Sequence, residues 1–174
     1  MNRLKNISRI MTIKVGDRLP DAKVVVTQHV ADPNACAIPQ PVTTTTLFKG
    51  KTAVLVSVPG AFTPTCHLQH IPAFIDKFDT FKQKGVDAIY VMSTNDIFVL
   101  NAWNHQMKGT AKIEMLADGN ADFAKLLGLE LDLTAKGMGI RSKRFALVAK
   151  DGVVTQLGIG ELDVSGADAV LAKL

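Results

Sequence analysis

The segment Thr52–Cys66 constrains the fold of this chain more than any other part of it. Thr52–Val58 is a short β-branched run, which suits a central strand covered on both faces. The chain then passes through Pro59-Gly60-Ala61-Phe62-Thr63-Pro64-Thr65-Cys66, which is rich in turn-forming residues. Beyond Cys66 the apolar residues have the spacing of an amphipathic helix, namely Ile71, Phe74, Ile75, Phe78 and Phe81. Strand, turn and helix in this order predict a crossover unit of an α/β protein.

Strands and helices are expected to alternate along the following part of the chain. The expected strands are Val86–Met92 and Ile113–Leu116, and the expected helices run from Asn95-Asp96 through Trp103 and over Ala121–Leu127. Pro72 should remove one backbone hydrogen bond and bend the first helix near its start. Two stretches are read mainly as irregular: short strands and loops over residues 12–50, and a loop over Gly128–Lys143.

The C-terminal part has a hairpin pattern followed by a helical one. Phe145–Val148 and Val153–Leu157 are joined around Asp151-Gly152, which is a strong hairpin signal. Ser165 is placed to cap a last helix, whose apolar face would include Leu174. Crossover units followed by a hairpin and a terminal helix predict an α/β fold with a central mixed sheet and helices on both faces.

At 174 residues the chain can bury the core of one domain, which we expect over residues 12–174. Residues 1–11 form an extension with apolar residues at helical spacing and basic residues between them. This composition is compatible with a mitochondrial-type targeting segment, and also with a disordered leader or a start at Met11. No apolar run approaches the roughly 20 residues needed to span a bilayer, so no membrane association is expected.

The formal net charge of +4 is concentrated at the N-terminus. Residues 1–16 contain four basic residues and no acid, which leaves 16 basic and 16 acidic residues in the rest of the chain. Binding to nucleic acid needs a basic face that neutralises several phosphates at once. The one other basic cluster, Arg141–Arg144, is short, so no nucleic-acid partner is expected.

The two cysteines, Cys36 and Cys66, are too few for a disulfide scaffold and do not form a Cys-x-x-Cys pair. The chain has only four histidines, so we expect neither a structural zinc site nor any other metal or cofactor. Cys66 follows a turn-rich segment and precedes a helix. The positive partial charge at a helix start and a nearby arginine both favour the thiolate, which is the nucleophilic form of cysteine.

The spacing Pro59-x-x-x-Thr63-x-x-Cys66 matches the active-site motif of the peroxiredoxins, and the whole segment 59–66 resembles their type II, or peroxiredoxin-5-like, subfamily. Other stretches agree in order: Lys84–Asp87, Asn95-Asp96 with Ala102-Trp103, and Arg141–Phe145. The resemblance covers nearly all of residues 12–174. It implies a thioredoxin-like fold and a thiol peroxidase that reduces hydrogen peroxide and alkyl hydroperoxides.

The resemblance also implies a role for four residues. Cys66 would be the peroxidatic cysteine, Thr63 would hold the sulfur and a peroxide oxygen through its hydroxyl, and Pro59 would shield the thiolate from water. Arg144 would be the active-site arginine. Two alternatives remain open: Thr63 could only cap the following helix, and Arg144 could be a surface residue with Arg141 in its place.

Cys36 lies 30 residues before Cys66, in a proline-flanked segment. The context Ala35-Cys36-x-Ile38-Pro39 resembles some fungal members of the family, in which an upstream cysteine resolves the sulfenic acid, in part across subunits. The alternatives are a one-cysteine mechanism with an external thiol, and an inert Cys36. By resemblance the reductant is thioredoxin, glutaredoxin or glutathione, and the chain forms a homodimer.

Two other functions compete with peroxide turnover. A disulfide oxidoreductase would normally carry Cys-x-x-Cys, whereas position 63 is Thr. A peroxide-sensing relay or holdase would react once and pass the oxidation to a partner. A cytoplasmic location is expected, with mitochondria suggested by the basic extension and peroxisomes by the C-terminal Ala172-Lys173-Leu174.

Overall fold

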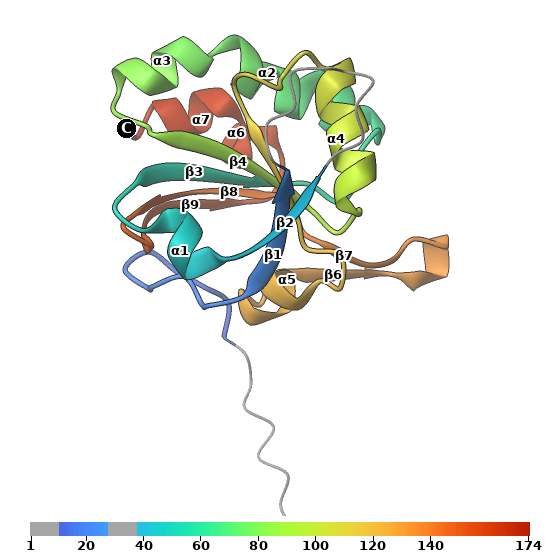
Figure 1. Ribbon diagram of the computed structural model, residues 1–174. Helices are drawn as coiled ribbons and strands as arrows, with labels where there is room; N and C mark the ends of the chain where they lie inside the picture. The colour runs from blue at the N-terminus through green and yellow to red at the C-terminus, as the bar shows by residue number, and fades with distance from the viewer. Residues whose placement is uncertain (1–10, 28–37) are drawn as a thin grey trace, which may run out of the picture.

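The computed structural model describes residues 11–27 and 38–174. Cys36 and residues 1–10 of the N-terminal extension lie outside the described residues. A seven-stranded sheet with the order β2-β1-β5-β4-β3-β8-β9 crosses the molecule (Figure 1). Its strands are β1 (Lys23–Thr27), β2 (Pro39–Thr43), β3 (Thr52–Ser57), β4 (Ala88–Ser93), β5 (Glu114–Ala117), β8 (Phe145–Lys150) and β9 (Val153–Ile159).

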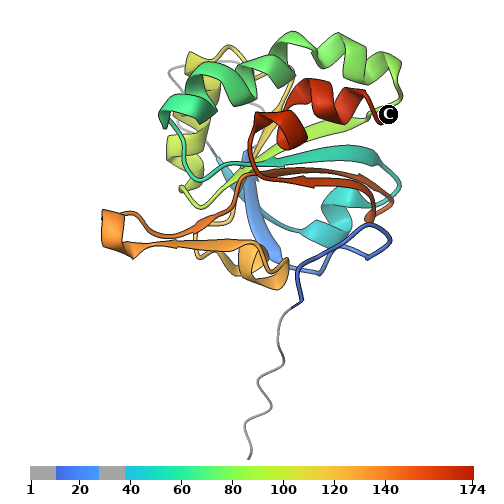
Figure 2. The ribbon, with the colours of Figure 1, turned by 180° about the vertical axis from the view of Figure 1, so that it is seen from behind.

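The sheet is mixed, as the alternating pattern predicts. Strand β4 runs parallel to both β3 and β5, and the other neighbours pair antiparallel. One face is covered by α2 (Ile71–Asp76), α3 (Phe78–Gln83), α4 (Ile97–Gln106), α6 (Leu162–Ser165) and α7 (Ala167–Leu171). The short helices α1 (Thr44–Phe48) and α5 (Asp122–Leu126) cover the other (Figures 1 and 2). The prediction of a mixed sheet with helices on both faces is confirmed.

Strand β3 lies inside the sheet because its side chains are apolar on both faces. Val54 and Val56 join the cluster that contains Phe74, Phe81 and Trp103. The intervening Ala53 and Leu55 join the opposite cluster, with Phe48 and Phe123. Since successive residues of a strand point to opposite faces, a continuous apolar run is what a strand between two helical layers requires.

The helix after Cys66 is irregular at its start. Cys66–His70 form a π-helix, η1, in which the amide of Ile71 donates to the carbonyl of Cys66. Pro72 follows as one of the first two residues of α2, where its missing N–H is tolerated. A disturbance near Pro72 was expected, but the second break, at Lys77 between α2 and α3, is not signalled by the apolar spacing.

Three details of the predicted element pattern are wrong. Gly128–Lys143 is not a loop: it contains β6 (Glu130–Leu133), the 3₁₀ turn η2 (Thr134–Lys136) and β7 (Gly139–Ser142), a hairpin that projects from the sheet (Figures 1 and 2). Four-residue strands are too short for alternation to stand out. The Thr43–Thr46 run lies in the stretch expected to form short strands and loops; it ends β2 and starts α1, with Thr43 accepting from the Thr46 amide.

Ser165 does not cap the last helix. It ends α6, and its hydroxyl donates to the carbonyls of Gly160 and Glu161, while Gly166 occupies the cap position of α7. The predicted hairpin is confirmed, with Asp151 and Gly152 at φ values of 48° and 75° in the turn between β8 and β9. Two adjacent positive φ values match the twist of the flanking strands.

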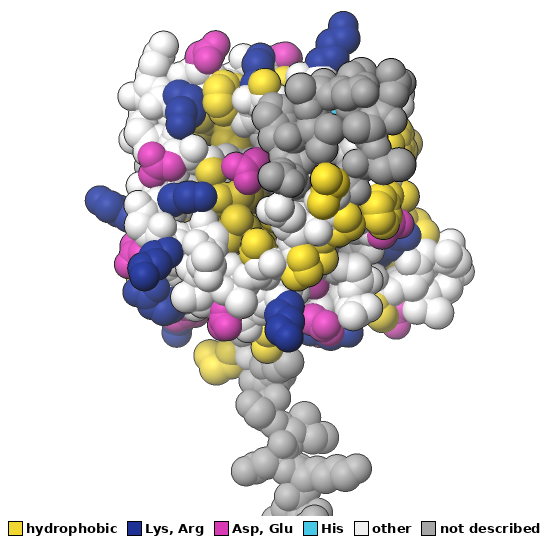
Figure 3. All heavy atoms as spheres, viewed as in Figure 1, with side chains coloured by type: hydrophobic (Ala, Val, Ile, Leu, Met, Phe, Trp, Pro, Cys, Tyr) yellow, Lys and Arg dark blue, Asp and Glu magenta, His cyan; other side chains and the backbone are white. Residues whose placement is uncertain are grey.

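Charge is dispersed on the surface drawn in Figure 3. Basic and acidic side chains are interspersed there, so this face presents no continuous basic band of the kind that binds phosphates. Among residues 11–27 and 38–174, no helix is long and apolar enough to cross a membrane.

Candidate active site

Sheet pairing brings Arg144 to Cys66. Strands β3 and β8 are antiparallel, with Ser57 opposite Phe145, so the residue before β8 lies beside the point where the chain leaves β3. From that point the chain passes through Pro59 to the helix that starts near Cys66. Arg144 Nη1 donates to Cys66 Sγ at 3.4 Å. Cys66 is 0% exposed and the Arg144 side chain 11% exposed, so the contact is buried.

The same Nη1 group of Arg144 also donates to His70 Nδ1, at 3.1 Å. Nδ1 must then carry no proton, and Nε2–H donates to the Ser165 carbonyl at 2.9 Å. The pKa of His70 is lowered to about 4, chiefly by burial; the Ser165 bond raises it, and the charge of Arg144 also lowers it. His70 is therefore neutral at pH 7 and fixed in one tautomer. The positive charge beside the sulfur comes from Arg144.

Glu161 approaches the other side of the guanidinium. Its Oε2 lies 3.4 Å from Arg144 Nε, but the groups are poorly aligned, and Nε has no hydrogen-bond partner within the described part of the chain. The Glu161 side chain is 78% exposed, so water screens this ion pair. The turn that carries Glu161 is held by the Ser165 hydroxyl. Arg144 is thus oriented mainly by His70 and by its burial.

Thr63 and Pro59 lie in the turn between β3 and the helix. Thr63 Oγ1 donates to the Gly60 carbonyl at 2.9 Å, and the Thr63 carbonyl accepts from the His67 amide at 2.9 Å. Among the described residues, the structure shows no capping bond from the Thr63 hydroxyl, which the alternative of a purely capping role would require. The Pro59 carbonyl accepts from Arg141 Nη1 at 3.2 Å. Arg144, and not Arg141, contacts the sulfur.

His70 and Asn95 also belong to this site, although the sequence pattern gives neither of them a role there. His70 follows Cys66 by four residues, which places the two on one side of a helix, so its proximity to the sulfur could have been found. Asn95 comes from the loop after β4, and its Oδ1 accepts from the Ala61 amide at 2.9 Å. This contact spans 34 residues, and no periodicity signals it.

An aromatic group borders the same turn. Phe62 has a φ of 61°, which is rare for a bulky residue, and is 45% exposed. Its ring lies 5.8 Å from that of His67 and 6.2 Å from that of Trp103. Trp103 is fully buried, and its Nε1 donates to His67 Nδ1 at 2.9 Å. The helix that carries Cys66 is thereby tied to α4.

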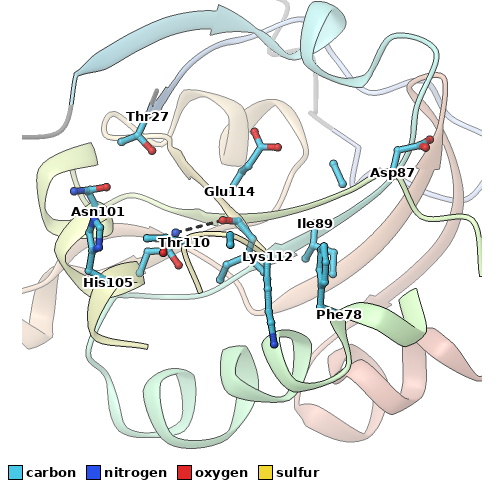
Figure 4. A pocket seen from close by; sticks show the side chains of 13 residues that line it. Thr27, Phe78, Asp87, Ile89, Asn101, His105, Thr110, Lys112 and Glu114 are labelled. Atoms are coloured by element: carbon cyan, nitrogen blue, oxygen red, sulfur yellow. Dashed lines mark hydrogen bonds between the residues drawn. The ribbon is translucent and has the colours of Figure 1, made fainter. Parts of the chain in front are cut away.

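A separate cavity of about 470 Å³ lies between the helices α3 and α4 and the strands β4 and β5 (Figure 4). Its lining includes Asp87, Asn101, Lys112 and Glu114, and none of the residues around Cys66. It also reaches Thr27, where the described chain breaks off, so we assign it no role. Within the described ranges no group of three or more His, Cys, Asp or Glu side chains is placed to hold a metal ion.

Comparison with known proteins gives a consistent result. A family model described as Redoxin matches residues 14–171. The chain is 45% identical over 171 residues to the chloroplastic peroxiredoxin-2E-2 of Oryza sativa subsp. japonica, covering 95% of this chain and 74% of that protein. It is similar to reduced Prx3 in complex with H₂O₂ from Vibrio vulnificus, with a TM-score of 0.81 and 42% identity over 94% of this chain and 100% of that one. It is also similar to peroxiredoxin 5 from Alvinella pompejana, with a TM-score of 0.78 and 34% identity over 92% and 97% of the two chains.

Proposed function

The chain belongs to the peroxiredoxins, a family of thiol-dependent peroxidases, in the type II or peroxiredoxin-5-like subfamily, and we propose that Cys66 is the residue that peroxide oxidises. Residues 12–174 act as one domain in this proposal. The observation that carries it is the 3.4 Å contact between Arg144 Nη1 and Cys66 Sγ. A guanidinium stays charged at every relevant pH, so it favours the thiolate, which attacks peroxide.

In the proposed reaction the Cys66 thiolate attacks the terminal oxygen of a hydroperoxide, R–O–O–H. An S–O bond forms as the O–O bond breaks. Sulfur is oxidised by two electrons to the sulfenic acid Cys–S–OH, and the other oxygen leaves as R–O⁻. A proton from water then gives the alcohol, or water where R is hydrogen. The substrates are therefore hydrogen peroxide and alkyl hydroperoxides.

Arg144 and Thr63 would act on different oxygens. Arg144 donates from Nη1 to the sulfur, next to the position where negative charge would develop on the leaving oxygen. The Thr63 hydroxyl donates its hydrogen to the Gly60 carbonyl, so it can only accept a hydrogen bond from a peroxide. It would accept from the terminal O–H and hold that oxygen in line with the sulfur. Pro59 would limit the access of water.

The first test replaces each cysteine in turn and measures hydroperoxide consumption with dithiothreitol in excess. Cys66→Ser is expected to abolish consumption and to keep the far-ultraviolet circular dichroism of the wild type. Cys36→Ser is the matched control and should still react with the first equivalent of peroxide. Undiminished turnover in Cys66→Ser would contradict the proposal. Turnover that stops after one equivalent in the wild type, with dithiothreitol present, would point to a sensor instead.

We propose Cys36 as the thiol that resolves the Cys66 sulfenic acid, on the basis of its sequence context alone. Thioredoxin, glutaredoxin or glutathione would then reduce the disulfide, and the chain would act as a homodimer. One equivalent of peroxide added to the wild type and to Cys36→Ser, followed by non-reducing gels and intact-mass analysis, tests this. A Cys36–Cys66 disulfide, within or between chains, supports a resolving role. A persistent sulfenic acid in the wild type contradicts it.

For location we propose the cytoplasm. The rice relative is described as chloroplastic, which concerns that protein. Leu174 packs against the apolar cluster around α7, and the Lys173 carbonyl accepts from Gln156, so packing accounts for the last residues without a receptor. Imaging of the chain with a fluorescent tag at its N-terminus, and separately at its C-terminus, tests the alternatives. Accumulation of either fusion in peroxisomes or mitochondria would contradict the proposal.

A further inference from the structure

The peptide unit between Gly60 and Ala61 is held at both of its polar ends. Its carbonyl, on Gly60, accepts from the Thr63 hydroxyl at 2.9 Å. Its N–H, on Ala61, donates to Asn95 Oδ1 at 2.9 Å. A peptide unit is planar, so its N–H and C=O point in opposite directions and turn together. Asn95 therefore fixes the direction of the carbonyl to which Thr63 donates.

Asn95 is itself held in place by its own loop. Ser93, which ends β4 and is fully buried, donates its hydroxyl to Asn95 Oδ1 at 2.8 Å. The Ser93 oxygen in turn accepts from the Asn95 amide at 3.3 Å. The Ser93 carbonyl accepts from the Asp118 amide, which ties this loop to β5. The acceptor that meets Ala61 is thus presented by a loop whose start is bonded to the residue after β5.

The surroundings of Gly60 leave little room for another arrangement. A methyl group built on Gly60 would lie 3.1 Å from Arg141 Nη1, 3.3 Å from Thr63 Cγ2 and 3.7 Å from Asn95 Oδ1. Arg141 in turn donates to the Pro59 carbonyl and to the Met138 carbonyl. These bonds do not involve Asn95, so we expect the turn to stay attached through Arg141 when Asn95 is replaced.

We propose that Asn95 is a positioning residue for peroxide reduction, acting through the Gly60–Ala61 peptide to orient the Thr63 hydroxyl. When this peptide is fixed, the Thr63 hydroxyl donates to the Gly60 carbonyl, and the lone pairs of Thr63 Oγ1 remain available to accept a hydrogen bond from the peroxide. With the peptide free to turn, Thr63 loses that acceptor and its hydroxyl rotates. The inference rests on the proposed role of Thr63 at Cys66, and it assigns no part to Asn95 in ionising the sulfur, which Arg144 contacts directly.

The experiment compares Asn95→Ala with Asn95→Asp and with Asn120→Ala, a matched control at an exposed asparagine outside the site. Two second-order rates are measured for Cys66 in each protein: with hydrogen peroxide and with iodoacetamide. The first needs an oriented peroxide, and the second reports the reactivity of the thiolate alone. Asn95→Ala should slow the peroxide reaction about tenfold and change alkylation less than twofold. Asn95→Asp, which keeps an acceptor oxygen, should recover most of the loss, and Asn120→Ala should match the wild type.

A double-mutant cycle with Thr63→Val separates positioning from general damage to the fold. If Asn95 acts through the Thr63 hydroxyl, adding Asn95→Ala to Thr63→Val should slow the peroxide reaction by less than a further twofold. The inference is overturned if the losses of Asn95→Ala and Thr63→Val multiply in full in the double variant. It is also overturned if Asn95→Ala leaves the peroxide rate unchanged, or lowers the alkylation rate as much as the peroxide rate. Ser93→Ala, which removes only the support of Asn95, should give a smaller loss with the same non-additivity. Failure of Cys66→Ser to abolish turnover would instead overturn the proposed function.

Discussion

Arg144 offers the two hydrogens of Nη1 to two acceptors, the sulfur of Cys66 at 3.4 Å and the imidazole of His70 at 3.1 Å. The imidazole of His70 is buried, so its Nδ1 needs the hydrogen bond from Arg144. The guanidinium of Arg144 is held mainly by this bond, because the side chain of Glu161, its partner in the ion pair, is exposed. His70 and Arg144 are thus each ordered by the other. At the scale of single residues, the site depends on a neutral histidine that adds no charge.

Replacing Arg144 tests the charge and the geometry together. Arg144→Met is expected to slow the reaction of Cys66 with hydrogen peroxide about 10²- to 10³-fold, the range found when a donor to a developing negative charge is lost. Arg144→Lys keeps the charge but not the planar fork, so its rate should lie between those of the wild type and of Arg144→Met. Stopped-flow kinetics gives the rates. Arg18→Met, at an exposed arginine that contacts Asp151, should react at the wild-type rate; if it is equally slow, the effect is not specific.

His70 makes stability depend on pH. Its pKa falls from 6.5 in the unfolded chain to about 4 in the folded one, chiefly through burial. The unfolded chain therefore binds the proton more tightly, and the contribution of His70 is complete above pH 6.5 and lost as the pH falls toward 4. The expected loss in the free energy of unfolding between pH 7 and pH 4 is about 3 kcal/mol. Urea unfolding of the wild type and of His70→Asn measures it, and equal pH dependence in both would contradict the assignment.

At the scale of elements, the sequence pattern predicts the strands and helices that have long apolar repeats, and misses those without them. Thr52–Ser57 and the β8–β9 hairpin are found because burial and turn residues agree. The β6–β7 hairpin is missed because each strand has four residues and an exposed side. Within the site, the motif 59–66 can be recognised from the sequence alone, and Arg144 can be assigned through the resemblance to the family. The contact with Asn95 depends on how strands β3 and β4 stand side by side, which the pattern does not specify.

The N-terminus of α4 offers a test of local signals. Asp96 accepts from the amides of Phe98 and Val99, both at 2.9 Å, as expected of a capping residue before an apolar helix. Asp96→Ala should lower the free energy of unfolding by about 1 kcal/mol, and Asp96→Ser should restore most of it. Chemical denaturation measures both. A loss in the serine variant as large as in the alanine variant would show that the cap does not account for the effect.

At the scale of the whole molecule, two apolar layers on either side of one sheet provide most of the cohesion. The layer that contains Phe81 and Trp103 packs the helices α2, α3, α4 and α7 against the sheet (Figure 1). An ion pair between Lys77 and Asp168 also joins the junction of α2 and α3 to α7, but its side chains are 35% and 84% exposed. Burial of apolar surface, rather than this ion pair, is expected to hold the layer in place.

Two substitutions in the same layer compare these contributions. Phe81→Ala removes a fully buried ring stacked on Phe74 and should lower the free energy of unfolding by about 3–5 kcal/mol. Asp168→Asn removes only the exposed ion pair and should lower it by less than about 1 kcal/mol. Thermal and urea unfolding give both values. A larger effect for Asp168→Asn than for Phe81→Ala would reverse this ranking.

Trp103 is the only tryptophan of the chain, and its indole N–H is bonded to His67, the residue directly after Cys66. The emission of a buried indole changes when its hydrogen-bond partner or packing changes. We expect oxidation of the sulfur to shift the backbone to which that partner belongs, which would make Trp103 an intrinsic fluorescent reporter beside the reacting atom. Each step of the redox cycle should then be visible in stopped-flow fluorescence without a dye, a label or a coupling enzyme.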